Sequence, residues 1–380
     1  MKKINIRKIN LFISTFLIIC FIFFIVIVFS EINIKTGQNV SNIKYIEWEK
    51  LKESNENIDE KDFYIMGFSQ NNEYILARNK VKNPELIQQN KIRLITKINT
   101  NNLNIENYYL PIQSIEQYLN LDNENILLLG NNGNYAGVFN INTGKLRTII
   151  QNKEGKKGFR FTNFVLKDDN KVYVEGYFFD ENQVAEDENN YWVEFYPDKS
   201  DLNAFGKKVV NTTEIVKKLG KVRMFYYAKP DLAIFTRMSG MYPTELWAYI
   251  NNKLTKIDTQ EYIIEIALSK NAEALYLYKK GKLSYFSVYN LITKKRVDIP
   301  SSEGRPFIYP FINSDGNVAV VSYLNLFNKK MDFYIGFKEN DYKLNELLSN
   351  VKMGSFKLSE DGYKFSLLNE DGVIIGNIIK

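Results

Sequence analysis

Short apolar runs separated by polar turns recur along most of the chain. The clearest unit extends from Ile115 to Ile150. In it, NLDNENILLLG reads as a turn leading into a strand, and YAGVFNINTGKLRTII reads as a strand, a turn and another strand. Gly144 suits the positive φ that such a tight turn demands. The pattern therefore predicts a unit of four short strands.

The first turn of this unit recurs seven times along the chain. The copies are FSQNNEYILAR from Phe68, LNLDNENILLL from Leu119, VLKDDNKVYVEG from Val165, YAKPDLAIFTR from Tyr227, ALSKNAEALYLY from Ala267, INSDGNVAVVSY from Ile312 and LSEDGYKFSLL from Leu358. A spacing of roughly 40–60 residues suits four-stranded propeller blades. Separate sandwiches also contain many short strands, but they are not expected to repeat one turn. We predict an all-β, seven-bladed β-propeller, with six or eight blades as alternatives.

The last unit contains only three predicted strands, at Gly354–Leu358, Tyr363–Leu368 and Val373–Ile379. An open sheet edge would expose unpaired backbone groups. The segment NIKYIEWEK, Asn42 to Lys50, is a β-like stretch before the first complete unit. We expect it to pair outside the last strand and close the ring. The alternative is a short helix from Glu47 to Glu53.

The SDG and EDG units and the NTGKL turn resemble the repeats of TolB-like and tryptophan–aspartate-type propellers. The resemblance covers most of residues 60–380 and implies the propeller fold. The tryptophan–aspartate dipeptide itself is absent from the sequence. No catalytic residue of these families can be transferred to this chain.

The N-terminal thirty residues differ from the rest of the chain. Residues 1–10 carry four basic side chains and no acid, and Leu11 to Ser30 contains no charge. At about 1.5 Å per residue, a helix of this length matches a hydrocarbon core of about 30 Å. We predict a transmembrane helix over 11–30, with the basic flank in the cytoplasm, a linker over 31–41 and an extracytoplasmic propeller over 42–380. A cleaved signal peptide is the alternative, although its apolar core is usually shorter.

Composition excludes several kinds of chemistry. The N-terminal flank holds four of the six net positive charges, so the remainder is nearly neutral and lacks the basic surface expected of a nucleic-acid partner. The sequence has no histidine, and its one cysteine, Cys20, lies in the apolar segment. Triads and zinc sites built on histidine or cysteine are therefore excluded outside that segment. The acidic stretch Asp180–Asn190 lacks the spacing of a calcium-binding EF-hand, so we expect a solvated loop, no metal and no cofactor.

The two faces of a propeller differ in their loops. The turns after the first and third strands of each blade form one face, here called the turn face; the other connections form the loop face. The loop-face connections are predicted to be long and irregular: Arg78–Lys91, Asn152–Arg160, Asp180–Asn190, Arg237–Glu245 and Ser301–Pro310. Binding sites often lie on variable loops held by a rigid scaffold. The alternative is that these loops vary because they have no role.

We therefore expect the loop face to recognise a partner. Apolar contacts would come from Met238, Met241 and Tyr242, and charge from Lys156, Lys157 and Arg160. In the long link between the third and fourth units, NTTEIVKKLGK from Asn211 predicts a short helix capped by Asn211 and ended by Gly220, which we expect to be a surface decoration.

These observations favour a non-catalytic binding module, held outside the membrane, that recognises a protein, a peptide or an envelope polymer. One alternative is a hydrolase or lyase of envelope carbohydrate, which would use two carboxylates in the central pocket. Another is a structural accessory subunit of a membrane complex. Sequence alone singles out no catalytic pair.

Overall fold

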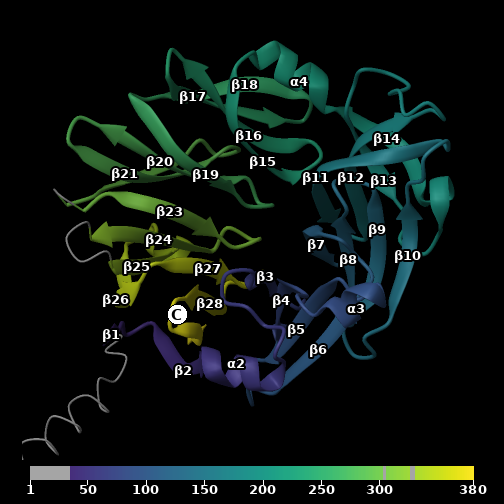
Figure 1. The fold of residues 1–380 in the computed structure, drawn as a ribbon. Coiled ribbons are helices and arrows are strands. Elements are labelled where there is room, and N and C mark those ends of the chain that lie inside the picture. The colour runs from purple at the N-terminus through teal and green to yellow at the C-terminus, as the bar shows by residue number, and fades with distance from the viewer. Residues whose placement is uncertain (1–34, 303–304, 326–329) are drawn as a thin grey trace, which may run out of the picture.

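The chain forms a closed ring of β-sheets (Figure 1). The computed structural model describes residues 35–302, 305–325 and 330–380. In this part of the chain, seven antiparallel sheets surround a central axis, and each of the seven predicted first turns joins the first two strands of one blade. The prediction of an all-β, seven-bladed propeller is confirmed.

The predicted transmembrane helix, Leu11 to Ser30, lies outside the described residues. Within the described ranges, no helix has the length and apolar character needed to cross a membrane.

Each blade contains four strands that follow one another from the centre of the ring outward. Blade 1 comprises β3 (Tyr64–Phe68), β4 (Tyr74–Lys80), β5 (Arg93–Asn99) and β6 (Ile105–Leu110), and blade 2 comprises β7 (Ile115–Asn120), β8 (Asn125–Gly130), β9 (Tyr135–Asn140) and β10 (Leu146–Gln151). Blade 3 comprises β11 (Gly158–Asp168), β12 (Lys171–Phe179), β13 (Tyr191–Phe195) and β14 (Phe205–Asn211), and blade 4 comprises β15 (Val222–Lys229), β16 (Leu232–Ser239), β17 (Tyr242–Ile250) and β18 (Lys253–Thr259).

The remaining blades follow the same order. Blade 5 comprises β19 (Tyr262–Leu268), β20 (Glu273–Lys280), β21 (Leu283–Asn290) and β22 (Arg296–Pro300). Blade 6 comprises β23 (Phe307–Ile312), β24 (Val318–Asn325), β25 (Lys330–Phe337) and β26 (Asn345–Lys352), to which the short β1 (Lys35–Thr36) adds a fifth strand. Blade 7 comprises β27 (Gly354–Leu358), β28 (Lys364–Asn369), β29 (Gly372–Ile378) and the N-terminal β2 (Val40–Glu47).

The helical elements lie in the connections between strands. They are α2 (Trp48–Ser54), α3 (Pro84–Gln88), α4 (Thr212–Leu219), and the 3₁₀ turns η1 (Asp201–Ala204) and η2 (Lys338–Asn340).

Strand β2 closes the ring by pairing antiparallel with β29, with Tyr45 opposite Ile374 and Val40 opposite Ile378. Figure 1 shows this N-terminal strand beside the C-terminal end of the chain. The strand ends at Glu47 and α2 begins at the next residue, so the expected strand and the alternative helix each describe part of the segment. Strand β1 also pairs with β26, which the sequence pattern does not predict.

A buried apolar cluster fills each of the seven interfaces between neighbouring blades in the described structure. At the closing interface, Ile46 and Leu51 from the N-terminal segment pack with Ile65 of blade 1 and Val373 of blade 7. Ile46 is 0% exposed. The closing strand therefore contributes apolar packing as well as backbone hydrogen bonds.

The first turns of four blades share one backbone geometry. In each, the N–H of the fourth turn residue donates to the carbonyl of the first, as Gly362 does to Ser359 (3.0 Å). The first residues of these turns are all buried: Ser69, Ser269, Asn313 and Ser359. The fourth residues all have positive φ: Asn72, Ala272, Gly316 and Gly362. A buried polar residue followed by a left-handed position explains the recurring turn pattern in the sequence.

Bonds between neighbouring blades connect much of the turn face into one layer. They include Asn120 Nδ2 to the carbonyl of Phe68 (2.9 Å), Lys167 Nζ to the carbonyl of Leu121 (2.5 Å), Lys229 Nζ to Asp168 Oδ1 (3.0 Å), the N–H of Ser314 to the carbonyl of Glu360 (3.1 Å), and Asn72 Nδ2 to Asp361 Oδ2 (2.6 Å). These bonds fix the relative positions of the blades at this face.

The closing strand yields a first prediction. Ile46→Ala should lower the free energy of unfolding by about 2–5 kcal/mol, because it removes buried apolar volume at the interface between blades 7 and 1. Urea denaturation measures this change. Glu47→Ala, at an exposed position of the same strand, is the matched control, and a loss below about 1 kcal/mol for Ile46→Ala would contradict the packing described.

Two glycines with similar backbone angles provide a second prediction. Gly316 has φ +73°, and a Cβ there would lie 2.6 Å from Glu273 Cγ, whereas Gly281 has φ +60° with open space around it. Both alanine variants should lose about 1–2 kcal/mol from backbone strain. Gly316→Ala should lose about 1–3 kcal/mol more, because it also crowds the interface between blades 5 and 6. Equal losses in thermal or urea unfolding would show that this interface is not tightly packed.

Candidate functional site

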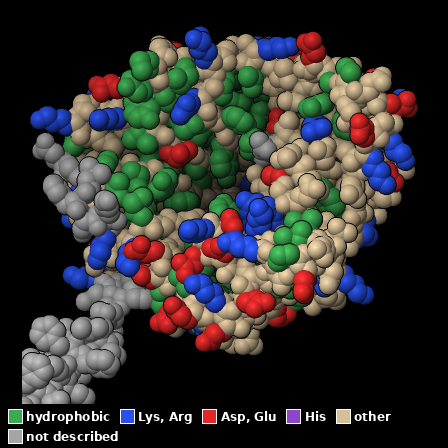
Figure 2. All heavy atoms as spheres, in the orientation of Figure 1, with side chains coloured by type: hydrophobic (Ala, Val, Ile, Leu, Met, Phe, Trp, Pro, Cys, Tyr) green, Lys and Arg blue, Asp and Glu red, His purple; other side chains and the backbone are tan. Residues whose placement is uncertain are grey.

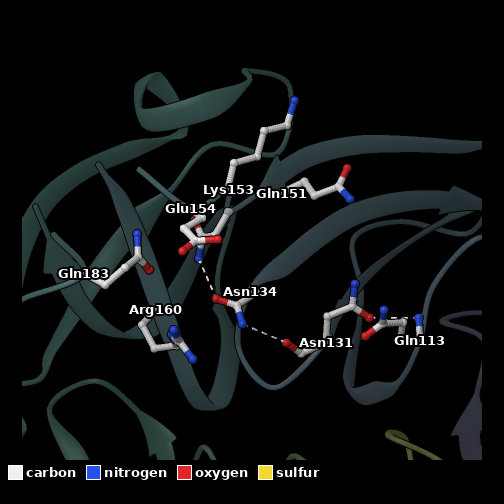
Figure 3. Close-up of a pocket in the computed structure, with 9 residues that line it drawn as sticks. Gln113, Asn131, Asn134, Gln151, Lys153, Glu154, Arg160 and Gln183 are labelled. Atoms are coloured by element: carbon white, nitrogen blue, oxygen red, sulfur yellow. Dashed lines mark hydrogen bonds between the residues drawn. The ribbon is translucent and has the colours of Figure 1, made fainter. Parts of the chain in front are cut away.

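A polar cavity of about 440 Å³ lies on the loop face between blades 2 and 3 (Figure 3). Its lining residues are Gln113, Asn131, Asn134, Gln151, Asn152, Lys153, Glu154, Arg160 and Gln183. Six of these nine side chains are amides, so we call the cavity the amide pocket. The link from blade 1, the β8–β9 hairpin, the link into blade 3 and the β12–β13 loop all contribute to it.

Hydrogen bonds hold the amides in place. Asn131 has positive φ in the β8–β9 hairpin, and its Oδ1 accepts the N–H of Gln113 (2.9 Å). Asn134 Nδ2 donates to the carbonyl of Asn131 (3.1 Å), and Asn152 Nδ2 donates to Asn134 Oδ1 (3.2 Å). Figure 3 shows this chain of bonds crossing the pocket. These hydrogen bonds therefore preorganise the pocket wall for a ligand.

Arg160, near the start of β11, supplies the half-buried cation of the pocket. Its Nη1 donates to the carbonyl of Asn132 (3.4 Å). Within the described ranges, its buried Nε has no hydrogen-bond partner and its guanidinium has no ion pair. A guanidinium offers five N–H donors in a planar fork, and among the described residues that of Arg160 makes one hydrogen bond, through Nη1.

The structure brings together only some of the charged residues expected on this face. Arg160 lines the amide pocket, and the carbonyl of Lys156 accepts a hydrogen bond from Gln183 Nε2 (3.3 Å) beside it. Lys156 and Lys157 have exposed side chains in the link that precedes β11. Of the three predicted cations, Arg160 lines the pocket, whereas Lys156 and Lys157 do not.

The apolar half of the predicted surface lies elsewhere, on blade 4. Met238 is in β16, Met241 is 82% exposed, and the ring of Tyr242 packs on Tyr262 at 5.2 Å. None of the three predicted residues lines the amide pocket. The expected long loop Arg237–Glu245 is wrong, because β16 and β17 continue through it and only two residues separate them.

The amides themselves were missed by sequence reasoning. Asn131 and Asn134 occupy a hairpin, where asparagine is common for its turn geometry alone. Gln113 and Gln183 come from connections far apart in the sequence. Four separate connections meet only in the folded ring, so no local motif reveals the pocket.

The central hollow offers two further cavities (Figure 2). Hydrophobic side chains gather along one side of the hollow in this view. One cavity, of about 360 Å³, is lined by Glu265 as its sole carboxylate, together with Tyr226, Tyr309 and Lys357 among others. Burial raises the pKa of the Glu265 carboxyl, although the backbone N–H of Ile266 opposes this.

The other cavity, of about 710 Å³, lies among the first turns of the blades. Its carboxylates include Asp168 and Glu360, which pair with Lys229 (3.0 Å) and Lys270 (3.0 Å). Carboxylates neutralised in this way stabilise the turn face. In the described part of the chain, no three Asp, Glu, His or Cys side chains are grouped so as to hold a metal ion.

Comparison with known proteins gives no relative in sequence. No family model matches the chain, and no curated protein is significantly similar to it. Solved structures do match. An oligogalacturonate lyase from Vibrio parahaemolyticus has 10% identity and a TM-score of 0.55, covering 91% of this chain and 98% of its own.

Two further structures are similar to the same degree. An oligogalacturonate lyase in complex with manganese has 7% identity and a TM-score of 0.54, covering 92% of this chain and 96% of its own. An uncharacterised protein from Listeria monocytogenes has 12% identity and a TM-score of 0.54, covering 90% and 98%. The C-terminal WD40 domain of Sif2 is less similar, with a TM-score of 0.38. At these identities, the comparisons show that the chain has the β-propeller fold and do not assign it to a family.

Proposed function

We propose that this chain is a non-catalytic binding module whose amide pocket binds an acidic saccharide of the cell envelope. The observation that carries the proposal is the guanidinium of Arg160, which has no ion pair among the described residues and lies in a pocket of six amides.

The chemistry of the pocket matches such a ligand. Amide side chains donate and accept hydrogen bonds, as sugar hydroxyls do, so six amides can satisfy several hydroxyls at once. A guanidinium binds a carboxylate through two parallel N–H···O bonds, which are stronger than bonds between neutral groups. The volume, about 440 Å³, is in the range typical of small-ligand sites. A mostly polar lining favours a hydroxyl-rich ligand over an apolar one.

The pocket offers little for catalysis. Most glycosidases use two carboxyl groups on either side of the scissile bond. Glu154 is the sole carboxylate that lines the amide pocket, and its side chain is exposed. These features support binding without bond cleavage.

A hydrolase or lyase is the second candidate, and one observation favours it. Glu265 in the central hollow has a carboxyl whose pKa is raised by burial, as a general acid requires. Its cavity supplies no second carboxylate to act as nucleophile or base. A Glu265→Gln variant that loses cleavage of an envelope saccharide would establish this alternative.

We further propose that Leu11 to Ser30 anchors the propeller outside the membrane, and that its repeats are of the TolB-like type. The uncharged apolar segment and the basic flank before it support the anchor. The buried polar residue that opens four of the first turns supports the repeat type. The alternative is an accessory subunit that docks into a membrane complex through this segment. In that case, replacing Leu11 to Ser30 with an unrelated anchor will dissociate the complex.

The role of Arg160 gives a third prediction. Trigalacturonate serves as the probe, and its methyl ester serves as the uncharged comparison. Arg160→Gln should weaken trigalacturonate binding about tenfold, and the methyl ester should bind wild type about tenfold more weakly than the acid, because both changes remove the ion pair. Isothermal titration of the full chain measures both affinities.

Controls separate this effect from a general loss of charge. Arg223→Gln removes a cation that does not line the pocket and should leave the affinity unchanged. If the acid and the ester bind wild type equally, or if Arg160→Gln and Arg223→Gln behave alike, the proposed site is wrong.

The exposed residues of blade 4 give a fourth prediction. The double variant Met241→Ala, Tyr242→Ala should leave trigalacturonate binding unchanged, because neither residue lines the amide pocket. It should weaken binding of long polygalacturonate about twofold or more if the polymer extends across the loop face. Unchanged polymer binding in surface plasmon resonance would remove these residues from the recognition surface.

A further inference from the structure

A second loop-face cavity, of about 510 Å³, lies between blades 3 and 4 beside α4. Its walls come from β11, β12, β15 and one side of the helix; we call it the α4 cavity. The lining residues are Thr162, Phe164, Glu175, Asn190, Thr212, Thr213, Val216, Lys217, Gly220, Phe225 and Tyr227. The predicted helix, capped by Asn211 and ended by Gly220, is confirmed. It is more than a surface decoration, because it forms a cavity wall and buries Ile215 and Leu219.

The cavity contains one buried carboxylate. Glu175 on β12 is 6% exposed, and its Oε2 accepts a hydrogen bond from the Thr162 hydroxyl (3.0 Å). Within the described part of the chain it has no ion pair. Burial raises the pKa of Glu175, while the hydroxyls of Thr212 and Thr162 act in the opposite direction. A lone carboxylate at this depth is costly unless a cation or a proton neutralises it.

Aromatic rings line the same cavity as this carboxylate. The rings of Phe164 and Phe225 lie 5.2 Å apart, and those of Phe164 and Tyr227 lie 6.0 Å apart. Phe225 is 43% exposed, an unusual position for so large an apolar side chain. The faces of such rings attract cations, and the attraction grows when water is excluded.

The cavity lacks an internal cation. Lys217 is the single basic residue among those that line it, and its side chain is exposed on α4. The other polar lining groups are hydroxyls, one amide and a phenol. Glu175 is the sole carboxylate that lines the cavity, and in the described part of the chain no three Asp, Glu, His or Cys side chains are grouped to hold a metal ion.

We propose that the α4 cavity binds an organic ammonium ion, with its charge against the Glu175 carboxylate and its methyl or methylene groups against Phe164, Phe225 and Tyr227. This site is separate from the amide pocket. It lies at a different blade interface and selects the opposite charge. Its existence does not depend on whether the amide pocket binds a saccharide.

Choline and its uncharged isostere 3,3-dimethyl-1-butanol provide a direct test with the full chain. Isothermal titration at constant ionic strength should show choline binding at least about tenfold more tightly than the isostere. Glu175→Gln keeps the shape of the side chain and should reduce choline affinity about tenfold. Phe225→Leu should reduce it about threefold. Glu214→Gln, a carboxylate of the same helix that does not line the cavity, is the matched control and should have no effect.

Three results would overturn the proposal. The first is equal binding of choline and the isostere, and the second is unchanged choline binding by Glu175→Gln. The third is choline binding that appears only after Lys217→Met, which would show that the chain's own ammonium occupies the cavity. Thermal unfolding of each variant checks that the fold is intact, and Glu175→Gln should unfold no earlier than wild type because it removes a buried charge.

The natural source of the ammonium group can be distinguished in the same assay. If the natural ligand is a free amine or a choline headgroup, choline should bind more tightly than Nα-acetyl-lysine amide. If it is a lysine side chain of a partner, Nα-acetyl-lysine amide should bind more tightly than choline. Binding to phosphatidylcholine vesicles that is lost in Glu175→Gln would identify the headgroup. Failure of both soluble probes to bind would refute the site.

Discussion

The pairing of β2 with β29 is the interaction on which the rest of the structure depends. A propeller has no sheet that crosses its centre, so each blade is held by its two neighbours. The N-terminal strand supplies the last edge of blade 7 and places Ile46 in the cluster shared with blade 1. Without it, blade 7 would have three strands, and its interface with blade 1 would lack part of its core.

The two faces of the closed ring have different roles. The turn face is connected by hydrogen bonds and ion pairs between blades, such as Lys229 with Asp168, and its buried turn residues leave little freedom. The loop face carries the amide pocket and the α4 cavity, each at the interface of two blades. The geometry of both cavities therefore depends on the relative positions of neighbouring blades, which the bonds of the turn face help to fix. Recognition on loops supported by a rigid scaffold is a common arrangement.

The fold can be predicted from the sequence because the residues that determine each turn are consecutive in the chain. The turn that opens at Ser359 and reaches its left-handed residue at Gly362 can be read from a few consecutive positions, and so can its copies. The closing strand can also be predicted, because the last unit has three strands where the other units have four. The helix that follows, Trp48–Ser54, corresponds to the alternative helix Glu47–Glu53, so the pattern of this segment predicts both elements but not that the strand and the helix occur in succession.

The sites were less predictable because they combine distant residues. The charge of its loop predicts Arg160, but only the fold shows that its guanidinium has no ion pair among the described residues. Met241 was selected from a loop that is in fact a tight hairpin. Glu175 lies within an otherwise largely apolar strand, and nothing in the sequence indicates that it lines a cavity together with aromatic residues of the next blade.

Hydrogen exchange at the backbone amides of β2 tests the closed ring most directly. If β2 closes the ring, those amides of residues 44–46 that donate to β29 should be protected to the same extent as their partners in β29 and should exchange together with them, because the two strands open as one unit. Rapid exchange across β2 while β29 stays protected would show that the N-terminal strand is not part of the ring, and would contradict the account.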